Sequence, residues 1–131
     1  MDKPGPEQDN AAHTLNDRRV LIVEDDYFLA DDLARGFGKA GIDIVGPVPS
    51  LAQALKLVEQ QRIDMAVLDI SLDGDKVYDV ADALIGRDVP ILFVTGYDRG
   101  DIPDRYAQVP MCQKPVGVDD VIAALERIVA A

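Results

Sequence analysis

The sequence predicts an α/β fold in which a five-stranded parallel sheet lies between two layers of helices. Short apolar runs recur five times, and the first of them is rich in β-branched residues, as expected of a strand that is covered on both faces. Segments with apolar residues at helical spacing stand between most of these runs, and this alternation is typical of a parallel sheet. With 131 residues, 48% of them hydrophobic, the chain is long enough for one buried core and short for two domains.

The predicted strands are apolar runs that end at polar or turn-forming residues. Val20–Val23 is wholly apolar and begins the folded part of the chain. The second run is expected to end at Gly46-Pro47, because proline cannot donate a hydrogen bond to a sheet. The strands are predicted at 20–23, 42–45, 65–68, 90–94 and about 111–113.

The predicted helices carry apolar residues on one face and begin at capping residues. Asp26 is expected at the start of the first helix and Ser50 at the start of the second, where their side chains can accept backbone hydrogen bonds. The stretch 98–108 is weak as a helix because Gly100 and Pro103 interrupt it, and we expect it to be mobile without phosphate. Helices are predicted at 27–40, from Ser50 to about 61, around 77–84 and at 118–130.

Composition excludes several classes of function. The net charge of −11 repels phosphate backbones and argues against nucleic-acid binding. The single cysteine, Cys112, excludes an internal disulfide, and the single histidine, His13, lies in residues 1–17, which we interpret as a flexible leader before a domain at 18–131. No run has the length of a membrane span and the N-terminus has no apolar signal region, so the sequence predicts a cytoplasmic protein without membrane contact.

Polar side chains with related chemistry follow four of the five predicted strands. In a parallel sheet these positions meet at one edge, where ligands of such folds bind. Carboxylates packed there would repel one another unless a cation joined them, and oxygen ligands in this number suit Mg²⁺. The residues are Glu24 and Asp25 after the first strand, Asp69 after the third, Thr95 and Gly96 after the fourth, and Lys114 after the fifth.

This set of groups could hold a phosphoryl group. Lys114 would supply a positive charge, the Thr95 hydroxyl would donate a hydrogen bond, and Gly96 would leave the entrance unobstructed. A carboxylate can act as the nucleophile and form an acyl phosphate. The sequence therefore predicts a magnesium-dependent phosphoryl site.

The motifs at these strand ends resemble those of the receiver domains of two-component response regulators, the CheY-like family. The resemblance covers about residues 18–131. It implies a flavodoxin-like (βα)5 three-layer sandwich with strand order 2-1-3-4-5 and, here, a short or irregular fourth helix. The matching motifs are Val23-Glu24-Asp25-Asp26, Val67-Leu68-Asp69, Val94-Thr95-Gly96 and Lys114-Pro115.

The resemblance also implies the function of the site. Asp69 would accept a phosphoryl group from a histidine kinase or a histidine phosphotransfer protein. Mg²⁺ would be held by Asp25, Asp69 and the backbone carbonyl of Ser71, with Glu24 assisting through water. Thr95 would read the phosphorylated state together with the strand-end lysine.

Some positions depart from the usual receiver pattern. The loop 70–75 lacks the usual methionine-proline pair, and Met111 stands where an aromatic switch residue is expected. Phe93–Tyr97 resembles the Phe-Ala-Thr-Gly-Tyr-like fourth strand of a subgroup of single-domain receivers, which implies a kinase of the HWE type. Ser71 and Tyr97 occupy positions expected to tune the phosphoryl lifetime, and Tyr97 either replaces the missing switch or packs in the core.

The sequence thus predicts a stand-alone receiver that catalyses only its own phosphorylation and dephosphorylation and is not otherwise an enzyme. Its output would be docking to a downstream protein or onward phosphoryl transfer, because no effector domain is expected after Ala131. One alternative is a Mg²⁺-dependent phosphohydrolase with an aspartyl nucleophile, which would need an acid at the position of Ser71. The other is an adaptor that works without phosphorylation.

Overall fold

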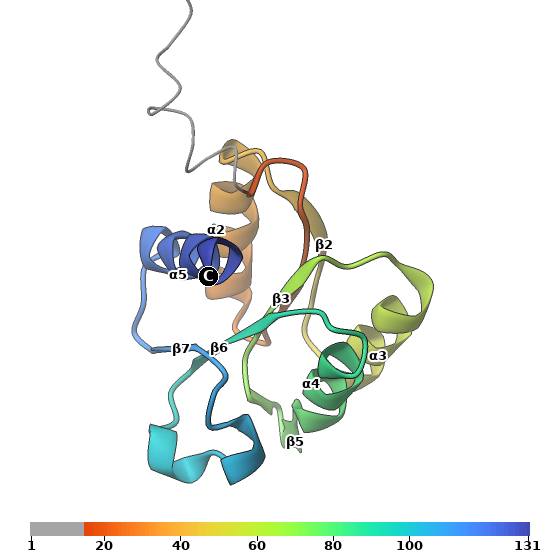
Figure 1. Cartoon of the computed structure of the whole chain (residues 1–131), viewed down its shortest axis with the longest axis vertical. Coiled ribbons are helices and arrows are strands. Elements are labelled where there is room, and N and C mark those ends of the chain that lie inside the picture. Colours follow the sequence, from red (N-terminus) through yellow and green to blue (C-terminus); the bar gives the residue numbers. More distant parts are fainter. Residues whose placement is uncertain (1–14) are drawn as a thin grey trace, which may run out of the picture.

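The computed structural model describes residues 15–131 and has a five-stranded parallel sheet at its centre (Figure 1). The strand order is β2-β1-β3-β6-β7, which is the predicted order 2-1-3-4-5 when the sheet strands are counted along the chain. The strands are β1 (Arg19–Val23), β2 (Asp43–Val48), β3 (Met65–Leu68), β6 (Ile91–Thr95) and β7 (Met111–Gln113).

Two pairs of helices cover the two faces of the sheet, so the α/β sandwich is confirmed (Figure 1). Alternate residues of β1 enter different apolar clusters: Val20 and Ile22 pack on one side, and Leu21 on the other. Both faces of the strand are buried, which explains its continuous apolar sequence. One face carries α2 (Tyr27–Lys39) and α5 (Val118–Ala130), and the other carries α3 (Leu51–Gln60) and α4 (Tyr78–Ile85).

The helix starts follow the predicted capping residues. The Asp26 carboxylate accepts hydrogen bonds from the backbone N–H of Phe28 (3.0 Å) and Leu29 (3.4 Å), so Asp26 begins α2. Ser50 caps α3 in the same way and accepts from the N–H of Gln53 at 3.2 Å. These bonds satisfy N–H groups that have no partner inside the helix.

Strand β2 continues past the point where the sequence ended it. Gly46 has φ of 95°, and the pairing of β1 with β2 is irregular between Leu21 and Val23. A Cβ at Gly46 would lie 3.0 Å from the Ile22 carbonyl oxygen, so glycine is required for this close approach. The pairing with β1 resumes at Val48, and the predicted end of the strand at Gly46-Pro47 is therefore wrong.

The stretch after β3, which the sequence suggested was an irregular polar loop, contains a small hairpin. Its strands are β4 (Ser71–Leu72) and β5 (Asp75–Lys76), and they pair antiparallel. Asp73 and Gly74 form the turn with φ of 50° and 95°, as a type I′ turn requires. The Asp-Gly pair is a known hairpin signal that our interpretation of the sequence overlooked.

The segment between β6 and β7 is irregular, as predicted, but it is also anchored. It forms two 3₁₀ turns, η1 (Arg99–Asp101) and η2 (Asp104–Tyr106), in place of a fourth helix. Tyr106 is buried, stacks on Tyr78 with 5.1 Å between ring centroids, and donates a hydrogen bond to Asp82 at 2.5 Å. These contacts anchor the segment at Tyr106, while its mobility without phosphate stays a prediction.

The folded part begins earlier than the predicted boundary at residue 18. Leu15 is buried in the cluster beneath α2 and α5, and the Asp17 N–H donates to the Gly41 carbonyl at 2.9 Å. Residues 1–14 of the predicted leader, with His13, lie outside the described residues. Among residues 15–131, no helix combines the length and the apolar character needed to cross a membrane.

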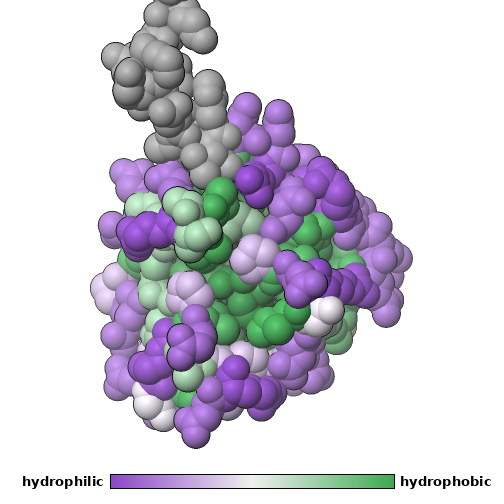
Figure 2. All heavy atoms as spheres, in the orientation of Figure 1, coloured by the Kyte–Doolittle hydropathy of each residue, from purple (hydrophilic) through white to green (hydrophobic). Residues whose placement is uncertain are grey.

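Polar side chains cover most of the face seen in Figure 2. Apolar side chains gather in the middle of this face, between α5 and the pair formed by α3 and α4.

Candidate functional site

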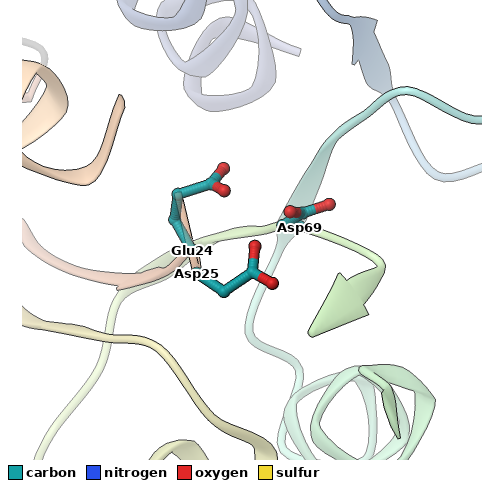
Figure 3. A group of neighbouring side chains, drawn as sticks. All are labelled: Glu24, Asp25 and Asp69. Carbon is teal, nitrogen blue, oxygen red and sulfur yellow. The ribbon is translucent and has the colours of Figure 1, made fainter. Parts of the chain in front are cut away.

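Three carboxylates meet at the carboxyl edge of the sheet (Figure 3). Glu24 and Asp25 follow β1 and Asp69 follows β3, and these strands are neighbours with Val23 opposite Leu68. One oxygen from each carboxylate lies within 4.8 Å of the others. In Figure 3 the Asp25 side chain points toward Asp69. The sheet topology therefore brings Asp69 beside Glu24 and Asp25, which lie 45 and 44 positions earlier in the chain, as the sequence predicted for these three.

Lys114 joins the two buried carboxylates. Its Nζ lies 3.0 Å from Glu24 Oε2 and 3.1 Å from Asp69 Oδ2. Lys114 follows β7, and its backbone N–H donates to the Thr95 carbonyl oxygen at 2.8 Å, which holds the end of β7 beside β6. The predicted strand-end lysine thus reaches the predicted acceptor across the width of two strands.

Burial controls the proton affinity of the site. Glu24 is 3% exposed and Asp69 is 5% exposed. Burial raises the pKa of Glu24 from 4.5 to about 7, although the Asp26 N–H donates to its carboxylate, and burial also raises the pKa of Asp69. Burial alone would lower the pKa of Lys114, but its bonds to the two carboxylates outweigh this and raise it.

The donor set fits a small divalent cation. Three carboxylates against one ammonium leave an excess of negative charge in a largely buried place, which a cation would neutralise. Asp25 is exposed and leaves a path from solvent, and carboxylate oxygens are the ligands that Mg²⁺ prefers. The half-buried Ser71 adjoins this cluster, since its N–H lies 3.4 Å from Asp69 Oδ1, while a role for its carbonyl stays a prediction.

Thr95 and Gly96 end β6 beside the carboxylates. The Thr95 side chain is fully buried, and its Oγ1 accepts a hydrogen bond from the Tyr97 N–H at 3.2 Å. No heavy atom lies within 4 Å of the place where a Cβ on Gly96 would sit. The space beside Gly96 is therefore open, while its role as an entrance stays a prediction.

Tyr97 and Met111, the candidate switch positions, are half-buried side chains that pack on the same apolar cluster. The Tyr97 hydroxyl accepts a hydrogen bond from Lys76 Nζ, which also lies 4.8 Å from the centroid of the Tyr97 ring. Core packing of Tyr97 is thus present in the structure. A switching role for either residue stays a prediction.

Two contacts of the hairpin with the site were not foreseen from the sequence. The Asp73 N–H donates to Asp25 Oδ2 at 3.0 Å, and Lys76 holds the Tyr97 hydroxyl. Only the Asp73-Gly74 turn signal pointed to a hairpin at all, and it says nothing about what the hairpin touches.

These observations define a class of protein. Its members have an open parallel sheet with a pocket of carboxylates, bridged by a lysine, at the carboxyl edge. Residues 20–126 match the family model described as the response regulator receiver domain. The chain therefore belongs to the response regulator receiver domain family. Receiver domains of response regulators interact with histidine kinases or phosphotransfer proteins, and they generally bind Mg²⁺ in an acidic pocket.

The chain is similar to several named proteins. It is 36% identical to SdrG from Sphingomonas melonis Fr1, with a TM-score of 0.76 over 88% of this chain and 98% of SdrG. It is 38% identical to SdrG in the BeF3-activated conformation, with a TM-score of 0.68 over 82% of this chain and 95% of that one. It is 28% identical to the transcriptional regulatory protein PdtaR of Mycobacterium tuberculosis over 86% of this chain, but it spans only 57% of PdtaR.

Proposed function

We propose that this receiver accepts a phosphoryl group on Asp69 from a histidine kinase or a histidine phosphotransfer protein, with a divalent cation, Mg²⁺, at the acidic cluster. The contact between Lys114 Nζ and Asp69 Oδ2 carries the proposal, because an acyl phosphate formed at Asp69 needs a fixed cation beside it. The proposal includes a kinase of the HWE type as donor and a cytoplasmic location, where the ATP that supplies the phosphoryl group is found.

The chemistry follows from the groups in the pocket. An ionised Asp69 oxygen attacks the phosphorus of a phosphohistidine, so a P–O bond forms and the P–N bond breaks. The electron pair of the P–N bond stays on the imidazole of the donor, which then takes up a proton. Lys114 favours the ionised form of Asp69, against the burial that raises its pKa.

The same pocket would hold the product. Lys114 remains within reach of an Asp69 oxygen, and the Thr95 hydroxyl can donate to a phosphoryl oxygen by turning from its present contact. A bound divalent cation would supply the charge that neutralises the remaining phosphoryl oxygens. The phosphoryl group then leaves by transfer to water or to a second histidine, and the chain catalyses only its own phosphorylation and dephosphorylation.

We further propose that the output is docking to a downstream protein or onward phosphoryl transfer. The likeness to SdrG supports the receiver as the acting unit, because this chain covers 98% of the solved SdrG chain. The BeF3-activated conformation of that protein supports a response to a phosphoryl group. The excess of negative charge makes nucleic acid an unfavourable partner for this chain.

The test is intact mass spectrometry after incubation with acetyl phosphate and Mg²⁺. We expect one phosphoryl adduct, lost in Asp69→Asn and when EDTA replaces Mg²⁺. The matched control is Asp88→Asn, an exposed aspartate with φ of 60°, a conformation that asparagine also accepts. This variant is expected to form the adduct as the wild type does.

Other outcomes separate the alternatives. An adduct that persists in Asp69→Asn would reject Asp69 as the acceptor. Rapid turnover of small phosphate esters would favour a phosphohydrolase. No adduct with acetyl phosphate or with a panel of HWE kinases would favour an adaptor that works without phosphorylation.

A further inference from the structure

The β4–β5 hairpin contacts the candidate site at two separate points. At its turn, the Asp73 N–H donates to Asp25 Oδ2 at 3.0 Å. At its other end, the Lys76 ammonium holds the Tyr97 hydroxyl and lies over the Tyr97 ring. The hairpin therefore touches a carboxylate of the acidic cluster on one side and the residue two positions after Thr95 on the other.

The hairpin is too short and too well anchored to absorb a movement internally. Leu72 is 2% exposed and Val77, which follows β5, is fully buried in the same apolar cluster. The Val77 N–H donates to the Ile70 carbonyl at 2.9 Å and extends the pairing of the two strands. Because packed interiors transmit displacement, a shift at the Asp73 turn would move Lys76 as well.

Tyr97 is held from two directions. Its N–H donates to Thr95 Oγ1 at 3.2 Å, and its hydroxyl accepts from Lys76. Lys76 is a charged donor near neutral pH, and this hydrogen bond raises its pKa further. The position of the Tyr97 side chain thus depends on a residue of the hairpin and on the hydroxyl that would contact the phosphoryl group.

Stability alone does not account for the contact between Lys76 and Tyr97. Lys76 is exposed, and exposed polar contacts of a lysine contribute little to the free energy of unfolding. Among residues 15–131, Lys76 is nevertheless the one cation that lies over the Tyr97 ring. A contact with little effect on stability can still select one orientation of a half-buried aromatic side chain.

We propose that Lys76 is a positioning residue, through which the β4–β5 hairpin couples cation binding at Asp25 to the orientation of Tyr97. A cation bound to the Asp25 carboxylate changes the group that accepts the hydrogen bond of the Asp73 N–H. The hairpin then shifts, and the contact of Lys76 with Tyr97 changes the orientation of the Tyr97 side chain. This inference rests on the proposed function only in that the acidic cluster takes a divalent cation.

The test follows backbone amide signals by NMR during a titration with Mg²⁺ alone. In the wild type we expect the amides of Asp73, Lys76 and Tyr97 to shift with one common midpoint. In Lys76→Met, which keeps the length of the side chain and removes the ammonium, Asp73 still shifts and the response of Tyr97 is lost. Lys76→Arg restores it. Lys56→Met, an exposed lysine of α3, is the matched control and behaves as the wild type.

The outcomes keep the two proposals apart. A Tyr97 shift of wild-type size in Lys76→Met overturns the coupling, whatever the phosphorylation assay shows. Tyr97→Phe breaks the same contact from the other partner and must also lose the response of the aromatic ring signals. If Mg²⁺ shifts no amide of the acidic cluster in the wild type, both the cation site and the coupling are wrong. Acetyl phosphate adducts in the same samples report on Asp69 separately.

Discussion

Replacing Glu24 by glutamine tests the electrostatics of the pocket in the absence of any cation. Glutamine keeps the shape of the side chain and an oxygen that can accept from Lys114 and from the Asp26 N–H, but it cannot ionise. Glu24 is 3% exposed, and burial raises its pKa from 4.5 to about 7. A difference in stability between the wild type and this variant that depends on pH therefore reports on the buried charge of Glu24.

The sign follows from proton binding. Between about pH 5 and about pH 7 the folded protein holds the Glu24 proton while the unfolded chain has lost it, so the wild type loses stability as the pH rises. A pKa raised from 4.5 to about 7 corresponds to roughly 3 kcal/mol, at about 1.4 kcal/mol for each tenfold change in proton affinity. Because Glu24 interacts with Asp69 and Lys114, this figure is an upper limit for the wild type relative to the glutamine variant.

The assay is urea unfolding followed by far-ultraviolet circular dichroism, with EDTA present. At about pH 5 the free energies of unfolding of the wild type and Glu24→Gln should be similar, and by about pH 8 the variant should be more stable by about 2–3 kcal/mol. Addition of Mg²⁺ should reduce this advantage, because the variant lacks one of the three carboxylates of the cation site. A cation stabilises the protein that binds it by about 2.7 kcal/mol when its concentration is about a hundred times Kd.

A difference between the two proteins that stays constant from about pH 5 to about pH 8 would refute this reasoning. It would mean that Glu24 ionises in the folded protein as readily as in the unfolded chain. A variant that is less stable than the wild type at about pH 8 would do the same, because it would show a net benefit of the ionised carboxylate.

Further predictions concern the rest of the framework. Lys114→Met should cost about 1–3 kcal/mol of stability near neutral pH and less at about pH 5, where the buried carboxylates can take up protons. An equal loss of stability at the two pH values in urea unfolding would contradict this prediction. Tyr106→Phe keeps the ring and removes the bond to Asp82, so the melting temperature should fall by the equivalent of about 1 kcal/mol, with faster amide exchange in residues 99–109. Gly74→Ala, at φ of 95°, should destabilise by about 1 kcal/mol, whereas Gly38→Ala in open space on α2 should stabilise by up to about 1 kcal/mol; similar effects of both would rule out strain at the turn.

Local patterns in the sequence were enough to predict the layout of the sheet and the edge at which its polar strand-end residues meet. Apolar runs such as Val20–Val23 mark strands covered on both faces, and the crossover rule then brings Asp69 and Lys114 to one edge. Capping residues are equally local, since the Asp26 side chain needs only the next two or three backbone N–H groups. Family membership is confirmed, and the matched residues 20–126 contain all of the strand-end motifs.

The departures arise where a contact far along the chain outweighs a local signal. Gly46-Pro47 looks like a strand end, but β2 has one extra residue there relative to β1 and continues to Val48. The breakers in 98–108 predict a loose segment, but Tyr106 finds a buried place against Tyr78 and fixes it. In each case, packing contributes more free energy than the local preference removes.

The sequence by itself determined the α/β architecture and the chemistry available at the edge of the sheet. Those depend on periodicity, turn residues and strand ends, which are properties of neighbouring residues. Only the tertiary structure decided that burial raises the pKa of Glu24 to about 7, that Lys114 bridges two carboxylates, and that Lys76 reaches Tyr97 across 21 positions. Burial and the distance between distant residues are set by how the layers pack, and proton affinity depends on both.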